Sequence, residues 1–260
     1  MIFDRGEGPV LVVVQGVHGR WEWMKPALLQ LARRCRTISY SLCGDIGSGS
    51  RPDPAQGFDN YLRQLDAVID RAGASRVALC GVSFGGIVAL RYAATRPHRV
   101  AALVLASSPA PGWHPNRQQA RWIAKPWLSA PVFVATAPIR VWPEVRAALP
   151  TVAARLGFFI RQGLRAASAP MIPSLMAERI ALTQKMDFTA DCARVEAPTL
   201  ILTGEEPLDR VVPVSSTRSF CSLIRGAEAA TLERTGHLGT MTQPSRFADI
   251  VGRFVHAHYH

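Results

Sequence analysis

The segment Leu-Cys-Gly-Val-Ser-Phe-Gly-Gly at positions 79–86 constrains the fold of this chain more than any other feature. It places Ser83 in a G-x-S-x-G pattern. The apolar run 76–80 before it is typical of a buried parallel strand, and apolar residues at helical spacing follow it in 87–95. We therefore expect Ser83 on a sharp strand-to-helix turn, where Gly81 and Gly85 avoid the clashes that a Cβ would cause.

This turn indicates a nucleophile. The backbone N–H of Phe84 would lie at a helix N-terminus, where it has no helical partner and is able to donate to an oxyanion forming beside Ser83. A simpler interpretation is that the small residues only allow close packing of strand and helix, since the pattern often occurs by chance. The strand before it and the helix after it favour the catalytic interpretation.

The strand, the turn and the helix together resemble the α/β-hydrolase family. The resemblance implies an α/β fold with a mostly parallel sheet, helices on both faces and an inserted all-helical cap. Only nine residues precede the first apolar run, Val10 to Val14, so the N-terminal strands are expected to be shortened or missing. A chain of 260 residues, 48% of them hydrophobic, is long enough for a core and a cap.

The loop after Val14 is where the resemblance implies a second oxyanion donor, the N–H of Val17. In the family a histidine usually stands where this chain has Gln15. An amide side chain is able to hydrogen-bond the backbone as an imidazole does. His18, in the same loop, is expected to be structural.

Two later loops supply the partners that a serine nucleophile needs. By resemblance the acidic residue is Asp209, four positions before Pro213, with Glu206 as the competing candidate. His237 follows the last predicted strand, which gives the chain order Ser, Asp, His. The serine hydroxyl is a poor nucleophile unless a group with a near-neutral pKa removes its proton, which predicts His237 as the base and Asp209 as its orienting group.

The alternation of strands and helices stops between positions 113 and 190, which we interpret as the helical cap; residues 1–112 and 191–260 would form the core. Helices are predicted at 116–128, 143–149, 152–166 and 173–185. Aromatic residues are interleaved with these helices. We assign three of them, Trp122, Trp142 and Phe159, to a substrate pocket, together with Trp21 from the core.

The cap is strongly basic. It holds ten Lys and Arg residues against three acidic ones, and so contributes +7 of the formal net charge of +11. The charge is explained either by a solvated surface or by a landing site for an anionic partner, such as an acidic acyl-carrier protein, a phospholipid headgroup or a carboxylated substrate. No nucleic-acid-binding motif accompanies it.

Other classes of protein are disfavoured. No apolar run approaches the length of a membrane span, and the first residues do not form a signal peptide. The five cysteines are scattered and odd in number, which favours free thiols in the cytoplasm and gives no indication of a metal site. The glycine-serine loop 43–50 lacks the lysine of a phosphate-binding loop. No cofactor is expected.

These observations predict a serine hydrolase that cleaves a carboxylic ester with a small or medium acyl chain through an acyl-enzyme on Ser83. The ester is implied by the resemblance, since esterases are the commonest activity in similar proteins. Hydrolysis of C–C bonds and cofactor-free perhydrolysis use the same residues and stay open. A hydrolase fold kept as a ligand receptor or scaffold with little turnover is the alternative from another class.

Overall fold

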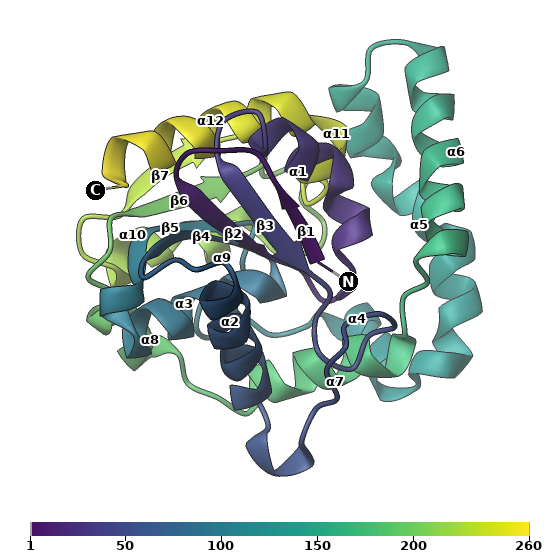
Figure 1. Cartoon of the computed structure of the whole chain (residues 1–260). Coiled ribbons are helices and arrows are strands. Elements are labelled where there is room, and N and C mark those ends of the chain that lie inside the picture. Colours follow the sequence, from purple (N-terminus) through teal and green to yellow (C-terminus); the bar gives the residue numbers. More distant parts are fainter. Residues whose placement is uncertain (1, 260) are drawn as a thin grey trace.

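A single seven-stranded sheet organises the chain in a computed structural model, which describes residues 2–259 (Figure 1). The spatial order is β1-β3-β2-β4-β5-β6-β7, and all neighbouring strands run parallel except β1 and β3. The strands are β1 (Ile2–Arg5), β2 (Val10–Val14), β3 (Arg36–Tyr40), β4 (Val77–Val82), β5 (Val100–Ala106), β6 (Thr199–Thr203) and β7 (Glu228–Thr231). The predicted mostly parallel sheet is confirmed, with one short antiparallel strand at its N-terminal edge.

Helices follow most of the strands. In the core these are α1 (Lys25–Leu31), α2 (Asp59–Arg71), α3 (Phe84–Thr95), α8 (Thr189–Arg194), α9 (Val214–Arg218), α10 (Phe220–Leu223), α11 (Gly239–Thr242) and α12 (Pro244–His258). Short 3₁₀ helices are η1 (Trp21–Met24), η2 (Pro54–Gln56) and η3 (Pro97–Arg99). The helix predicted to begin at Trp21 therefore starts with a 3₁₀ turn, and Pro26 lies in the first turn of the α-helix that follows.

Two apolar layers cover the two faces of the sheet. Val12 and Val14 of β2 point into the layer shared with α2, α3 and α8, whereas Leu11 and Val13 point into the layer shared with α1 and α12. Figure 1 shows these helices on opposite sides of the strands. Because the strands are buried on both faces and run parallel, the loops at their carboxyl ends gather along one edge of the sheet.

Four helices lie between β5 and β6, ahead of α8: α4 (Arg117–Ala124), α5 (Pro126–Ala148), α6 (Val152–Ser168) and α7 (Pro173–Gln184). Helices α5 and α6 stand away from the sheet at the right of Figure 1. This arrangement agrees with the all-helical insertion that the resemblance implied.

The prediction of a helix beginning at Pro143 is wrong, because α5 continues through three internal prolines, Pro131, Pro138 and Pro143. A proline inside a helix removes the hydrogen bond to the carbonyl four positions earlier. Here those carbonyls belong to Trp127, Val134 and Ile139, and all three residues are exposed. Water is therefore able to take the place of each missing N–H, which lowers the cost of continuing the helix.

Candidate active site

Ser83 lies on the turn between β4 and α3 in a backbone conformation that is rare for a residue with a side chain. Its φ is 55° and its ψ is −121°. A Cβ at Gly81 would collide with the backbone of Gly85, and one at Gly85 would collide with the backbone of Val14. The turn therefore requires glycine at both positions, and it holds the serine in a strained geometry that is typical of functional sites.

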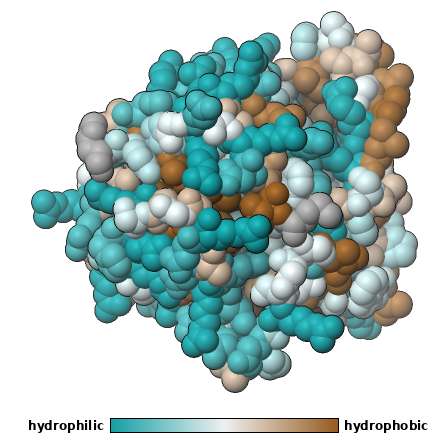
Figure 2. All heavy atoms as spheres, in the orientation of Figure 1, coloured by the Kyte–Doolittle hydropathy of each residue, from teal (hydrophilic) through white to brown (hydrophobic). Residues whose placement is uncertain are grey.

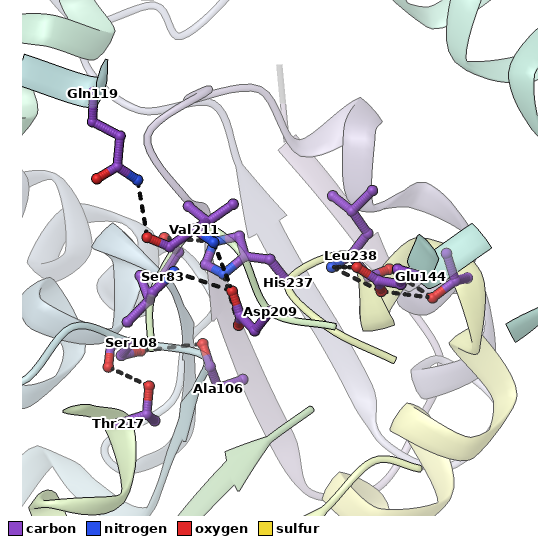
Figure 3. Close-up of polar contacts among 12 residues, drawn as sticks. Ser83, Ala106, Ser108, Gln119, Glu144, Asp209, Val211, Thr217, His237 and Leu238 are labelled. Carbon is purple, nitrogen blue, oxygen red and sulfur yellow. Dashed lines mark hydrogen bonds and ion pairs between the residues drawn. The ribbon is translucent and has the colours of Figure 1, made fainter. Parts of the chain in front are cut away.

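His237 joins Ser83 to Asp209 (Figure 3). Its Nε2 lies 3.1 Å from the Ser83 hydroxyl, and its Nδ1 lies 3.2 Å from Oδ2 of Asp209. The other oxygen of Asp209 accepts hydrogen bonds of 3.0 Å from the backbone N–H groups of Val211 and Val212. Glu206, the competing acid, is exposed and has no contact with His237 among the hydrogen bonds and ion pairs of residues 2–259.

The electrostatics of the site favour the protonation states that a base and its orienting group need. Burial disfavours the charged imidazole, but the charge and hydrogen bond of Asp209, with a further contribution from Glu144, outweigh it and raise the pKa of His237. Burial also acts on Asp209, yet attraction to His237 and the two backbone N–H groups lower the pKa of its carboxyl. Asp209 is thus an anion that holds the Nδ1 proton of His237.

The loop after β2 passes directly beside Ser83. A Cβ on Gly16 would lie 3.5 Å from the Ser83 Cβ, so the residue before Val17 lies next to the Ser83 side chain. Gln15 is fully buried, and its amide donates to the Ser39 hydroxyl of β3 and to the Val13 carbonyl. Gln15 therefore anchors this loop to the neighbouring strand.

Arg179 of α7 holds the same loop from the other side. Its guanidinium donates to the Val17 carbonyl at 2.8 Å and forms a buried ion pair with Asp45. A further hydrogen bond of 3.3 Å reaches the Cys43 carbonyl. The orientation of the Val17 peptide thus depends on a side chain from the helical insertion, 162 residues away.

Glu144 of α5 makes a matching contact with the loop of His237. Its two carboxylate oxygens each lie 3.0 Å from the backbone N of Leu238, and the Thr242 hydroxyl donates to one of them (Figure 3). Glu144 is buried, with 3% of its surface exposed. Sequence reasoning missed this residue, although a signal was present: it is the only acidic residue between positions 113 and 177.

His18 lies in the loop after β2 as a neutral imidazole. Burial, together with the nearby charge of Arg179, lowers the pKa of His18 to about 4. Its Nδ1 faces the backbone N–H of Arg20 at 3.3 Å, so Nδ1 accepts and the proton of the neutral ring is on Nε2. This hydrogen bond agrees with the structural role expected for His18.

The four aromatic residues predicted for a substrate pocket lie in three separate places. Trp21 packs on Phe3 at 5.5 Å between ring centres, against the layer of α1 and α12. Trp122 of α4 contacts Phe133 of α5 at 5.0 Å. Trp142 stacks on Phe159 at 6.3 Å, where α5 meets α6. These residues pack neighbouring elements together, which is the commoner use of aromatic residues at helical spacing, and they do not form one wall.

Among residues 2–259, no group of three or more His, Cys, Asp and Glu side chains is arranged to hold a metal ion. All five cysteines are free thiols, and four of them are buried. Among the described helices, none has both the length and the apolar character needed to cross a bilayer.

Comparison with known proteins gives a family and a set of relatives. The family model described as "Alpha/beta hydrolase family" matches residues 11–250. A protein named putative carbamate hydrolase RutD, from Klebsiella pneumoniae, is 26% identical over 94% of this chain and 90% of its own length. The 2-hydroxy-6-oxo-2,4-heptadienoate hydrolase of Pseudomonas putida is 26% identical over 98% and 92%. A hydrolase structure from Pseudomonas aeruginosa matches with a TM-score of 0.77 and 25% identity, over 98% and 93%.

Proposed function

Because this chain belongs to the alpha/beta hydrolase family, we propose that it hydrolyses a carboxylic ester with a small or medium acyl chain through an acyl-enzyme on Ser83. The observation that carries this proposal is the 3.1 Å approach of His237 Nε2 to the Ser83 hydroxyl, with Asp209 on the opposite side of the ring. A hydroxyl, an imidazole and a carboxylate in this order form the set that activates a serine.

The proposed reaction has two halves. His237 Nε2 takes the hydroxyl proton as the Ser83 oxygen attacks the ester carbonyl, and the N–H groups of Val17 and Phe84 stabilise the oxyanion. Collapse of this intermediate expels the alcohol, which takes the proton back from His237. Water then attacks the acyl-enzyme, His237 accepts its proton, and the acid leaves as Ser83 regains its hydrogen.

We further propose that residues 113–190 cover the site as a cap. Two side chains support this placement: Glu144 of α5 contacts the loop of His237, and Arg179 of α7 contacts the loop of Val17. Both loops belong to the site described above, so the insertion is packed over the same edge of the sheet.

The location of the protein in the cytoplasm stays a prediction.

A second candidate is hydrolysis of a C–C bond in a dioxo acid. The name of the Pseudomonas putida relative, 2-hydroxy-6-oxo-2,4-heptadienoate hydrolase, favours it, since that protein matches this chain over nearly its whole length. The two candidates share the residues of the site and differ in the leaving group, which is an alcohol in one case and a carbanion equivalent in the other.

A substrate panel separates these candidates. Nitrophenyl esters of increasing acyl length, an aryl carbamate and a dioxo acid are each given to the native protein and to Ser83→Ala. We expect the highest kcat/KM with a short or medium ester and loss of that activity in Ser83→Ala. Turnover of the dioxo acid well above every ester would favour the second candidate, and no turnover of any member of the panel would count against both.

A further inference from the structure

Helix α5 exposes an apolar stripe. Trp127, Leu128, Val132, Ile139 and Trp142 recur at helical spacing, and each is between 44% and 76% exposed. The stripe runs for about 22 Å, because each helical residue advances the axis by about 1.5 Å. On a surface helix such a stripe normally faces the protein core. In α5 it faces solvent.

Helix α6 repeats the pattern. Val152, Leu156, Ile160 and Leu164 occupy every fourth position and are between 54% and 76% exposed. Ten of the fourteen large hydrophobic residues exposed among the described residues lie on α5 and α6. Figure 2 shows hydrophobic residues gathered along the edge of the molecule where Figure 1 places these helices. We call the two stripes together the α5–α6 face. Exposed hydrophobic patches of this kind often mark interaction sites.

Cationic side chains accompany this face. Positions 113–177 contain eight Arg and Lys residues and a single acidic one, Glu144, which is buried. None of the eight takes part in the ion pairs found among residues 2–259. Arg146 and Arg161 are exposed on α5 and α6 themselves. Positions 113–177, which include α5 and α6, therefore have uncompensated positive charge and no exposed carboxylate.

We propose that the α5–α6 face binds the surface of an anionic lipid bilayer, with both helices lying in the interface. Apolar stripes flanked by arginines, with tryptophan at each end of the α5 stripe, have the composition of helices that lie on membranes. Each basic residue near the surface adds attraction to anionic headgroups.

Other occupants fit these observations less well. A second copy of the chain in a two-fold dimer would place the same basic surface against itself, with repulsion between like charges. An acidic protein would satisfy the charges but does not require apolar stripes along two helices. Binding of this face is independent of the proposed reaction, so Ser83→Ala should bind as the native protein does.

The test is cosedimentation with vesicles of phosphatidylcholine alone or mixed with an equal part of phosphatidylglycerol. We expect binding to the mixed vesicles, little binding to phosphatidylcholine alone, and weakening as salt is added. The triple variant Leu156→Gln, Ile160→Gln and Leu164→Gln should lose binding. Its matched control changes three exposed hydrophobic residues of the core, Ile2→Gln, Leu29→Gln and Ile46→Gln, and should keep it.

Two double variants test how much the arginine charges contribute to vesicle binding. Arg146→Gln with Arg161→Gln should weaken binding to mixed vesicles roughly ten-fold or more. Arg225→Gln with Arg253→Gln removes the same charge from exposed positions outside the α5–α6 face and should change binding much less. Thermal unfolding of each variant checks that it is folded.

Three results would overturn the proposal. The first is no binding to the mixed vesicles at low salt, and the second is equal loss of binding in the variants and their controls. The third is a concentration-dependent dimer in ultracentrifugation that the triple variant abolishes while the vesicles remain unbound, because the face would then be an interface between copies of the chain.

Discussion

At the scale of single residues, Asp209 orients the imidazole of His237, and His237 is the proposed base. Asp209→Asn keeps the size of the side chain but removes the charge that holds the Nδ1 proton of His237. We expect kcat to fall by about 10⁴-fold while KM changes little, because the wrong tautomer prevents Nε2 from acting as a base. Steady-state kinetics measure this. Glu206→Gln, an exposed neighbour in the same loop, is the control, and a comparable loss in that variant would contradict the assignment.

Glu144 is expected to act on the same imidazole from a distance. Its negative charge contributes to the raised pKa of His237, and protonated His237 is unable to take the Ser83 proton. The kcat/KM therefore falls as pH decreases through that pKa. Removing the charge in Glu144→Gln lowers the pKa of His237, so the acidic limb of the pH profile should move to lower pH.

Glu178→Gln provides the control for this prediction, since Glu178 is exposed on α7 and belongs to the same helical insertion. Its pH profile should match that of the native protein. If the Glu144→Gln profile also coincides with the native one, Glu144 only supports the loop of His237 and does not influence its protonation.

At the scale of structural elements, the loop after β2 and the turn before α3 each have a testable geometry. Val17→Pro removes the backbone N–H proposed as an oxyanion donor, whereas Val17→Ala keeps it. We expect the proline variant to lose about 10²–10³-fold in kcat, with a smaller effect on KM, and the alanine variant to stay close to the native value. Equal kinetics for the two folded variants would contradict the proposed role of this N–H.

Two glycine substitutions, one in the turn around Ser83 and one on α6, should change the free energy of unfolding in opposite directions. Gly85→Ala places a Cβ against the backbone of β2, so the free energy of unfolding should fall by about 1–3 kcal/mol or more. Gly163→Ala on α6 meets no neighbouring atom within 4 Å and should raise it by about 0.5–1 kcal/mol. Urea unfolding measures both. A neutral Gly85→Ala would show that the turn is less tightly enclosed than described.

The elements also show what the sequence was able to predict. The G-x-S-x-G turn and the parallel strands depend on local patterns that are visible in the chain, whereas Asp209 was assigned by resemblance to the family. The continuity of α5 was not, because the cost of its internal prolines depends on whether the affected carbonyls reach water. That exposure is a property of the folded molecule.

At the scale of the whole molecule, the site is held by contacts between distant parts of the chain. Arg179 reaches the loop of Val17 across 162 residues, and Glu144 reaches the loop of His237 across 94. Neither belongs to a motif, so their partners were not predictable from spacing. The assignment of Trp21, Trp122, Trp142 and Phe159 to a substrate pocket stays a prediction, because helical periodicity says that a residue is packed, but not against which element.

Labelling with a fluorophosphonate shows whether Ser83 is a nucleophile activated by His237, since the reagent bonds covalently to an activated serine. Intact-protein mass spectrometry should show one adduct, mapped by peptide digestion to Ser83. The adduct should be absent in folded Ser83→Ala and form much more slowly in His237→Ala. A folded native protein that stays unlabelled, or that is labelled at another residue while Ser83→Ala keeps its esterase activity, would contradict the account.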